Sequence, residues 1–233
     1  MHTHKEAMFP MTRTRLRDRL LPDYTHGEEL FNMISHIVGG GTGVVVLILC
    51  LWRAILRQVG WAVAGSILYG LSCIQLYTIS SVYHGLRPGM GKRVLQVIDH
   101  CTIYLFIAGT YTPIMLTSLR PVYPGWAWTI LGIVWGLAVL AIVLNAIDLK
   151  RFKVFSMICY LGMGWCVIIG IRPMVEVVPA DGLLMILAGG IVYTIGAVLY
   201  GLGKKKRYMH SVFHLCCLIG SILQALSILI YVL

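Results

Sequence analysis

The side chains with the clearest capacity for chemistry are histidines near the ends of hydrophobic segments. His210 and His214 are four residues apart, which places both imidazoles on one face of a helix. Helices often offer two nitrogen ligands to zinc in this way, although the spacing alone is a weak signal. His84, in another segment, supplies a third imidazole. Three protein ligands with one open position are typical of catalytic zinc rather than structural zinc.

Two further polar side chains accompany these histidines. Ser80 precedes His84 by four residues and therefore shares its helix face, although a bond to its own helix is an alternative role for the hydroxyl. Asp99 could bind the metal directly, or it could accept a proton from water whose pKa zinc has lowered to about 7. Three histidines and a carboxylate would fill a four-coordinate shell. We therefore favour Asp99 as general base and Ser80 as a residue that holds water or an oxyanion.

The elements that must position these residues are membrane helices. Of the 233 residues, 58% are hydrophobic and 12% charged, and the mean hydropathy is +0.83, whereas ordinary soluble domains have about 25% charged residues. These values exclude a soluble globular protein, and the length leaves no room for a separate nucleotide-binding domain. Seven cysteines without a CxxC pair exclude a regular disulfide framework and a cysteine zinc ribbon.

Seven runs with few charges are long enough to cross a bilayer, and each must be helical because lipid cannot satisfy backbone polar groups. The runs are residues 30–52, 58–86, 94–119, a stretch within 121–147, 154–171, 183–203 and 208–233. The sequence therefore predicts an all-α membrane protein with seven transmembrane helices. We expect residues 1–29 to form an N-terminal tail and residues 30–233 to form the transmembrane domain.

The basic residues predict the orientation of the chain. Fifteen of the 19 Lys and Arg residues fall in the tail and in the loops after the second, fourth and sixth runs. Because such loops remain cytoplasmic, we predict a cytoplasmic N-terminus and an external C-terminus. The net charge of +10 then has a topological cause, and no nucleic-acid partner is expected.

With this orientation, His84, Asp99, His210 and His214 lie at a similar depth near the cytoplasmic face. At about 1.5 Å per residue, Asp99 and the two histidines of the last run lie roughly 3 to 9 Å from the starts of their helices. The spacing within each motif does not require that the three segments place these residues at the same depth. It is the main sequence-based support for a single metal site.

Other polar residues are assigned smaller roles. Glu29, Asn32 and His36 share a helix face and predict a second polar cluster, in which His36 has a structural or ligand-supporting role rather than a ligating one. His100 points about 100° away from Asp99 and is expected to pack or to bond to a neighbouring helix.

Three sequence features bear on structure rather than chemistry. The glycine-rich run 39–43 predicts a close-packing surface, and Pro113 predicts a kink in the third helix. We expect His2, His4 and His26 of the tail to face water.

Three motifs resemble those of the hemolysin III family, the bacterial branch of the progestin and adiponectin receptor group. They are SSVYH at 80–84, IDH at 98–100 running into IAGTYTP at 107–113, and HSVFH at 210–214 running into GS at 220–221. The Glu29, Asn32, Ser35 and His36 set is similar to the N-terminal signature of the family. The resemblance covers nearly the whole chain, and it departs mildly at Cys216 and Cys217, where bulkier apolar residues are expected.

The resemblance implies a multi-pass protein of the bacterial inner (plasma) membrane. Eukaryotic members and the related alkaline ceramidases hold zinc with three histidines that match His84, His210 and His214. An aspartate that matches Asp99 contacts the zinc-bound water, and a serine that matches Ser80 lies beside the site. Those relatives cleave, or are held to cleave, lipid amide bonds, which implies a membrane lipid as substrate or ligand.

Three functional hypotheses follow. The first is a zinc-dependent hydrolase of lipid amide or ester bonds with a role in membrane lipid homeostasis. The second is a non-catalytic sensor or regulator of membrane state, in which zinc is a structural clasp. The third, a pore-forming cytolysin, has the least support because a lytic protein must be soluble before it inserts. Iron and manganese are alternative metals, but three imidazoles favour zinc, and the sequence does not predict an oligomeric state.

Overall fold

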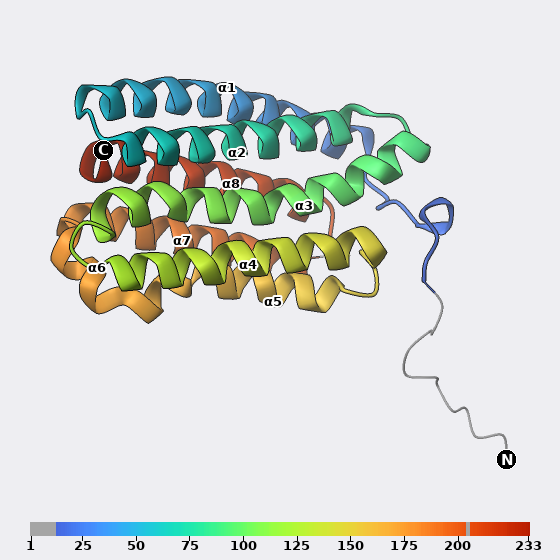
Figure 1. Cartoon of the computed structure of the whole chain (residues 1–233). Coiled ribbons are helices and arrows are strands. Elements are labelled where there is room, and N and C mark those ends of the chain that lie inside the picture. The colour runs from blue at the N-terminus through green and yellow to red at the C-terminus, as the bar shows by residue number, and fades with distance from the viewer. Residues whose placement is uncertain (1–12, 204–205) are drawn as a thin grey trace, which may run out of the picture.

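The computed structural model describes residues 13–203 and 206–233. Its helices lie side by side in a single bundle (Figure 1). They are α1 His26–Leu56, α2 Gly60–Gly85, α3 Met90–Pro113, α4 Pro124–Asp148, α5 Lys153–Gly164, α6 Ile171–Val177, α7 Ala180–Leu202 and α8 Met209–Ser227. The described residues contain seven helical stretches long and apolar enough to span a membrane, and they contain no strand. The predicted all-α, seven-helix class is therefore confirmed. His2 and His4 lie outside the described residues.

The first helix begins earlier than predicted because a capping box starts it. The hydroxyl of Thr25 accepts a hydrogen bond from the backbone N–H of Glu28 (3.2 Å). In return the Glu28 carboxylate accepts one from the backbone N–H of Thr25 (2.8 Å). The helix therefore starts at His26, which is exposed, rather than at residue 30. This shift places Glu29 inside the bundle instead of in the tail.

The fifth span is broken rather than continuous. Helix α5 ends at Gly164, residues Cys166–Gly170 form a 3₁₀ turn, and α6 carries the span to Val177. Tyr111 of α3 supports the break, since its hydroxyl donates to the Gly164 carbonyl and accepts from the Val167 N–H, both at 2.9 Å. These bonds satisfy backbone groups that the interrupted helix cannot pair in lipid.

The glycine-rich part of α1 packs closely against α2, as the sequence predicted. A Cβ atom on Gly39 would overlap the ring of Tyr77, and one on Gly43 would lie 3.2 Å from Cys73. A Cβ on Gly41 meets no described atom within 4 Å. Only the glycines that face α2 therefore form the close-packing surface.

Pro113 ends α3, and the chain continues as a π-helical turn over Ile114–Leu119. Proline cannot donate to the helical ladder, so the hydrogen-bond pattern changes here. A Cβ atom on Gly65 of α2 would lie 2.7 Å from the Pro113 Cα. The absence of a side chain at Gly65 therefore lets α2 and α3 approach at this point.

Candidate metal centre

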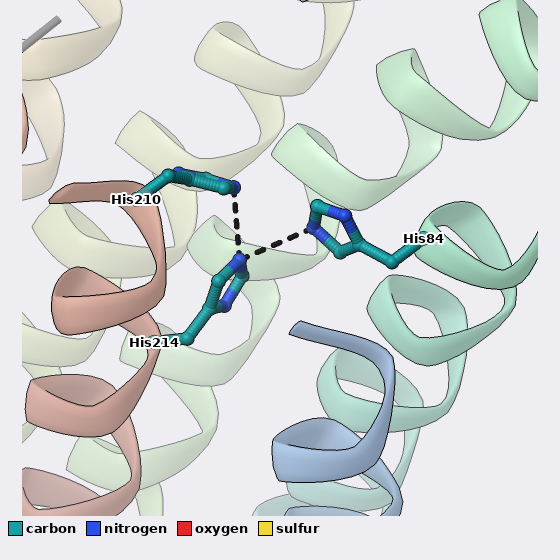
Figure 2. Close-up of side chains that lie close together, drawn as sticks. All are labelled: His84, His210 and His214. Carbon is teal, nitrogen blue, oxygen red and sulfur yellow. Dashed lines mark hydrogen bonds between the residues drawn. The ribbon is translucent and has the colours of Figure 1, made fainter. Parts of the chain in front are cut away.

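Helices α2 and α8 bring the three predicted histidines together at one end of the bundle. Figure 2 shows His84, His210 and His214 pointing toward one another. The Nε2 atom of His214 lies 3.2 Å from Nε2 of His84 and 2.8 Å from Nε2 of His210. Their potential ligand atoms all lie within 4.8 Å of one another, which is close enough to hold one metal ion. We call these residues the histidine cluster.

The secondary structure explains this convergence. His84 occupies the last turn of α2, while His210 and His214 occupy the first turns of α8. These helices run in opposite directions, and α1 packs against both of them. The four-residue spacing in α8 then aligns its two imidazoles on the face toward His84.

Glu29 fixes the orientation of His84. Its Oε2 atom lies 2.6 Å from Nδ1 of His84, and its Oε1 atom accepts a hydrogen bond of 2.6 Å from Nζ of Lys92. A carboxylate paired with a lysine acts as an acceptor, so Nδ1 of His84 is the donor and carries the proton. In the neutral imidazole, Nε2 then presents its lone pair to the cluster, as metal ligands require.

Lys92 joins three helices at this point. It is 4% exposed, and besides Glu29 of α1 its ammonium group donates to the Leu86 carbonyl at the end of α2 (3.0 Å). Lysine is rarely buried unless its charge is paired. The acceptors of the Lys92 ammonium group lie on α1 and at the end of α2. In the sequence Lys92 is recognisable only as one of the loop charges, because no local pattern indicates this contact.

His36 lies behind the cluster rather than in it. Its Nε2 atom contacts Nδ1 of His214, and the side chain is buried. The expectation that His36 supports a ligand agrees with this contact. The prediction of a separate Glu29, Asn32 and His36 cluster is wrong, because Glu29 and His36 contact different members of the histidine cluster. Shared helix-face spacing could not reveal these two partners on other helices.

Asp99 and Ser80 lie beside the cluster and line the same cavity as His210 and His214. Asp99 is 8% exposed, and its carboxylate is within electrostatic range of His84 and beside Ser80. Its oxygens are not among the ligand atoms that converge within the described residues. The Ser80 hydroxyl is buried next to the Asp99 carboxylate, and the alternative bond to its own helix is not formed.

His100 is held by bonds to its own helix and to α5. Its Nδ1 atom lies 2.8 Å from the Gln96 carbonyl oxygen one turn earlier. Its backbone carbonyl accepts a hydrogen bond of 3.0 Å from the Tyr160 hydroxyl of α5. The expected contact with a neighbouring helix therefore forms through the backbone, while the imidazole bonds within α3.

Two tyrosines cover His210. The ring of Tyr24, just before α1, stacks on the imidazole with 4.9 Å between centroids and 5° between planes. Tyr200 of α7 lies at 5.2 Å on a tilted plane. Burial raises the pKa of the Tyr24 phenol well above its usual range, so its hydroxyl stays neutral. Tyr24 was not predicted as part of the site because it falls in the tail that precedes the first apolar run.

A cavity of about 960 Å³ extends from the cluster into the bundle. Its inner wall is largely apolar and includes Ile103, Phe106, Ile107, Ile186 and Leu187. Ligand sites of small molecules typically have about 300–1,000 Å³. The cavity is therefore large enough to hold an organic molecule with a long apolar part next to the imidazoles.

Comparisons with known proteins give matches over most of the chain. The family model described as haemolysin-III related matches residues 24–225. The chain is 36% identical over 206 residues to Hemolysin-3 of Bacillus cereus. This alignment covers 88% of this chain and 92% of that protein. It is 33% identical over 208 residues to the Hemolysin-3 homolog of Bacillus subtilis (strain 168), covering 89% and 96%. Identity to the human monocyte to macrophage differentiation factor is 26% over 163 residues, covering 66% and 65%.

Proposed function

The chain belongs to the haemolysin III-related family, and we propose from this premise that it is a zinc-dependent integral membrane hydrolase of lipid amide or ester bonds. The observation that carries the proposal is the histidine cluster, in which three imidazoles present Nε2 atoms to one point. Asp99 and Ser80 line the same cavity. We place this site at the cytoplasmic face of the bacterial inner membrane, from the distribution of basic residues.

The residues present fit a metal ion. The Glu29 contact turns the Nε2 lone pair of His84 toward His214, whose Nε2 lies 3.2 Å away. When His214 donates from Nδ1 to His36, its Nε2 lone pair faces the same point. Lone pairs that face one another at this distance repel, and a cation between them would accept all of them. Three nitrogen ligands suit zinc. When bound, zinc supplies Lewis-acid polarisation of a carbonyl and lowers the pKa of water to about 7.

Asp99 and Ser80 supply the proton transfer and the hydrogen bonding. Asp99 takes a proton from water as the water oxygen bonds to the carbonyl carbon of the lipid. The Ser80 hydroxyl, which lies next to Asp99 and forms no bond to its own helix, donates to the carbonyl oxygen as negative charge develops there. The bond to the leaving nitrogen or oxygen then breaks, and Asp99 returns the proton to it, which gives a fatty acid and an amine or alcohol.

The cavity supports a lipid as the substrate. Its apolar inner wall suits an acyl chain, while its polar lining includes Asp99 and two members of the histidine cluster, His210 and His214. A carbonyl group joins the apolar and polar parts of such lipids. The scissile bond would therefore lie where the cavity changes from apolar to polar, next to the groups proposed to cleave it.

A structural clasp is the second candidate function. The contacts of Glu29, Lys92 and His36 link α1, α2, α3 and α8 around the cluster, so a metal there would also hold helices together. Direct lysis, which the name Hemolysin-3 suggests for the Bacillus cereus relative, has less support here. Seven apolar spans do not suit a protein that must first be soluble.

Hydrolysis can be tested by the fate of solvent oxygen. Purified protein is reconstituted with a bacterial lipid extract in H₂¹⁸O, and released fatty acids are measured by mass spectrometry. We expect one ¹⁸O atom in the new carboxylate with the wild type and with Asp181→Asn, an exposed acid distant from the cluster. Asp99→Asn should release labelled acid at least about 10²-fold more slowly. Wild-type protein that contains metal but yields no labelled acid would contradict the hydrolase and favour the clasp.

A further inference from the structure

Residues 13–24, which we call the N-terminal strap, cross the end of the bundle where α2 ends and α3 begins (Figure 1). The strap is attached first to the end of α4. Nε of Arg13 donates to the Ile147 carbonyl, and the backbone N–H of Thr14 donates to the Asp148 carboxylate, both at 2.8 Å. These bonds connect segments that are 134 residues apart in the chain.

The strap is attached again at α3 and beside α8. Nε of Arg93 donates to the Arg19 carbonyl (3.0 Å), and Nη1 of Arg207 donates to the Asp23 carbonyl (2.7 Å). The next residue, Tyr24, stacks on His210. The strap therefore forms part of the cavity wall at the same end as the histidine cluster.

The side chain of Arg19 is the unusual feature of this wall. Arg19 is 7% exposed and lines the cavity. Its Nε and Nη1 atoms are buried and have no acceptor among the residues that the structure describes. A guanidinium group stays charged at any ordinary pH, and burying its donors without an acceptor is strongly unfavourable. The position of these donors on a cavity wall points to an anionic ligand.

Other charges at this end strengthen that inference. The basic residues that line the cavity besides Arg19 are Lys150, Lys153, Lys206 and Arg207. The nearby acids have partners of their own. The Glu28 carboxylate accepts from Thr25 and from the Tyr208 N–H. Arg207 pairs with Glu28 (3.5 Å) and with Asp23 (3.6 Å), which also lines the cavity, so the inference rests on Arg19 rather than on Arg207. The Asp148 carboxylate accepts from the N–H groups of Thr14, Lys150 and Arg151. Asp18 lines the cavity, but its side chain is 60% exposed and lies 3.7 Å from Nε of Arg17.

We propose that Arg19 binds the phosphate of an anionic phospholipid headgroup at the mouth of the cavity. The planar guanidinium group matches phosphate oxygens with two parallel hydrogen bonds. The acyl chains of the same lipid would occupy the apolar wall deeper in the cavity. That anionic phospholipids are the substrates rests on the proposed function. Binding of the headgroup by Arg19 does not depend on that function.

Binding can be measured by thermal unfolding of the purified full chain in neutral detergent. The probes are dihexanoyl phosphatidylglycerol, dihexanoylglycerol without phosphate, and inorganic phosphate. Because a ligand that binds only the folded state stabilises it with increasing concentration, each titration gives an affinity. For the wild type we expect saturable stabilisation by the phospholipid at concentrations at least about tenfold lower than for either other probe.

Variants identify the residue responsible. Arg19→Gln should weaken phospholipid affinity by about 10- to 100-fold, because charge-assisted hydrogen bonds are lost. The matched control is Arg17→Gln, in the same segment but with a side chain that is 65% exposed, and its affinity should equal that of the wild type. If Arg19→Gln does not fold, Arg19→Lys replaces it, and the lost guanidinium geometry should still weaken binding. Unchanged affinity in the folded Arg19 variant would overturn the proposal.

The probes separate the possible sources of the anion. Equal affinity for inorganic phosphate and phospholipid would overturn a lipid headgroup and indicate a free phosphate site. Equal affinity for phospholipid and dihexanoylglycerol would overturn an anion site altogether.

A variant of the histidine cluster separates this proposal from the proposed function. His214→Ala, which removes a predicted metal ligand, should keep wild-type phospholipid affinity. If the headgroup site holds while no labelled fatty acid is produced, the failure belongs to the hydrolase alone. Loss of phospholipid binding in a folded His214→Ala protein would contradict a separate headgroup site.

Discussion

The two ends of the bundle differ in what their interiors are made of. At the end where α2 finishes and α1, α3 and α8 begin, the buried side chains are mainly polar and include Asn32, His36, Ser80, His84, Lys92, Gln96, Asp99 and His214. At the opposite end they are mainly small or apolar and include Cys50, Ala54, Ala62, Met115, Leu119, Ile228 and Val232. We call these the histidine end and the apolar end.

The difference indicates a division of labour. Helices in lipid gain stability from close packing, and the apolar end provides it through contacts such as Gly65 against Pro113. Polar groups in a membrane are costly and usually functional. Most buried polar atoms without a partner in the described chain lie at the histidine end, on Arg19, Asn32, His36, Ser80, His210 and Ser211. The buried polar groups without a partner are therefore concentrated at the end that holds the candidate metal site.

The largest expected effect is at the proposed general base. Asp99→Asn keeps the shape of the side chain but cannot accept the proton, so fatty-acid release should fall by about 10²- to 10⁴-fold. Initial rates in the ¹⁸O assay measure this effect, with Asp181→Asn as the control. Metal content should stay at the wild-type value, since Asp99 is outside the converging ligands. A variant with the wild-type rate would remove Asp99 from the mechanism.

The next effect concerns the residue that orients His84. Glu29→Gln replaces the carboxylate acceptor 2.6 Å from Nδ1, and groups of this kind typically contribute 10- to 100-fold to metal affinity. We expect zinc to be lost at about 10- to 100-fold lower chelator concentration than in the wild type. Asp181→Asn should match the wild type. Identical chelator curves for Glu29→Gln and the wild type would show that the contact does not tune the site.

A substitution at the apolar end should separate stability from metal binding. In Gly65→Ala the new Cβ would lie 2.7 Å from the Pro113 Cα, and such overpacking typically costs about 1–3 kcal/mol. Unfolding in mixed micelles with increasing sodium dodecyl sulfate measures this change. The matched control is Gly132→Ala, where a Cβ meets no described atom within 4 Å. Reduced metal content in folded Gly65→Ala protein would contradict the independence of the two ends.

The smallest effect is expected at the start of α1. Thr25→Ala removes the hydroxyl that caps the Glu28 N–H, which typically costs about 1 kcal/mol. The same unfolding titration measures it, and Thr25→Ser should restore the cap. If serine restores nothing, the capping box does not set the start of this helix.

The sequence predicts the fold class well because lipid imposes strong rules on long apolar runs. It also predicts that His84, His210 and His214 share one depth, because each is close to the end of its run. The break in the fifth span at Gly164 cannot be predicted from the sequence, because it is supported by the Tyr111 hydroxyl of another helix. Contacts between distant segments escape local patterns in the same way.

Glu29, Lys92 and Arg19 illustrate this limit. Glu29 contacts His84 across 55 residues and Lys92 across 63, and the Arg19 side chain faces a cavity that only the assembled bundle forms. The helix-face spacing in α1 grouped Glu29 with His36, whereas the structure directs them to His84 and His214. Helix periodicity indicates which residues share a face, but it does not indicate which helix that face meets.

We propose that the three histidines of the histidine cluster hold a metal ion. Elemental analysis of the purified, folded protein tests it most directly, with His210→Ala and Asp99→Asn prepared in parallel. We predict about one zinc ion per chain in the wild type and in Asp99→Asn, and near-complete loss in His210→Ala. Folded wild-type protein without bound metal, or a His210→Ala variant that retains it fully, would contradict the claim.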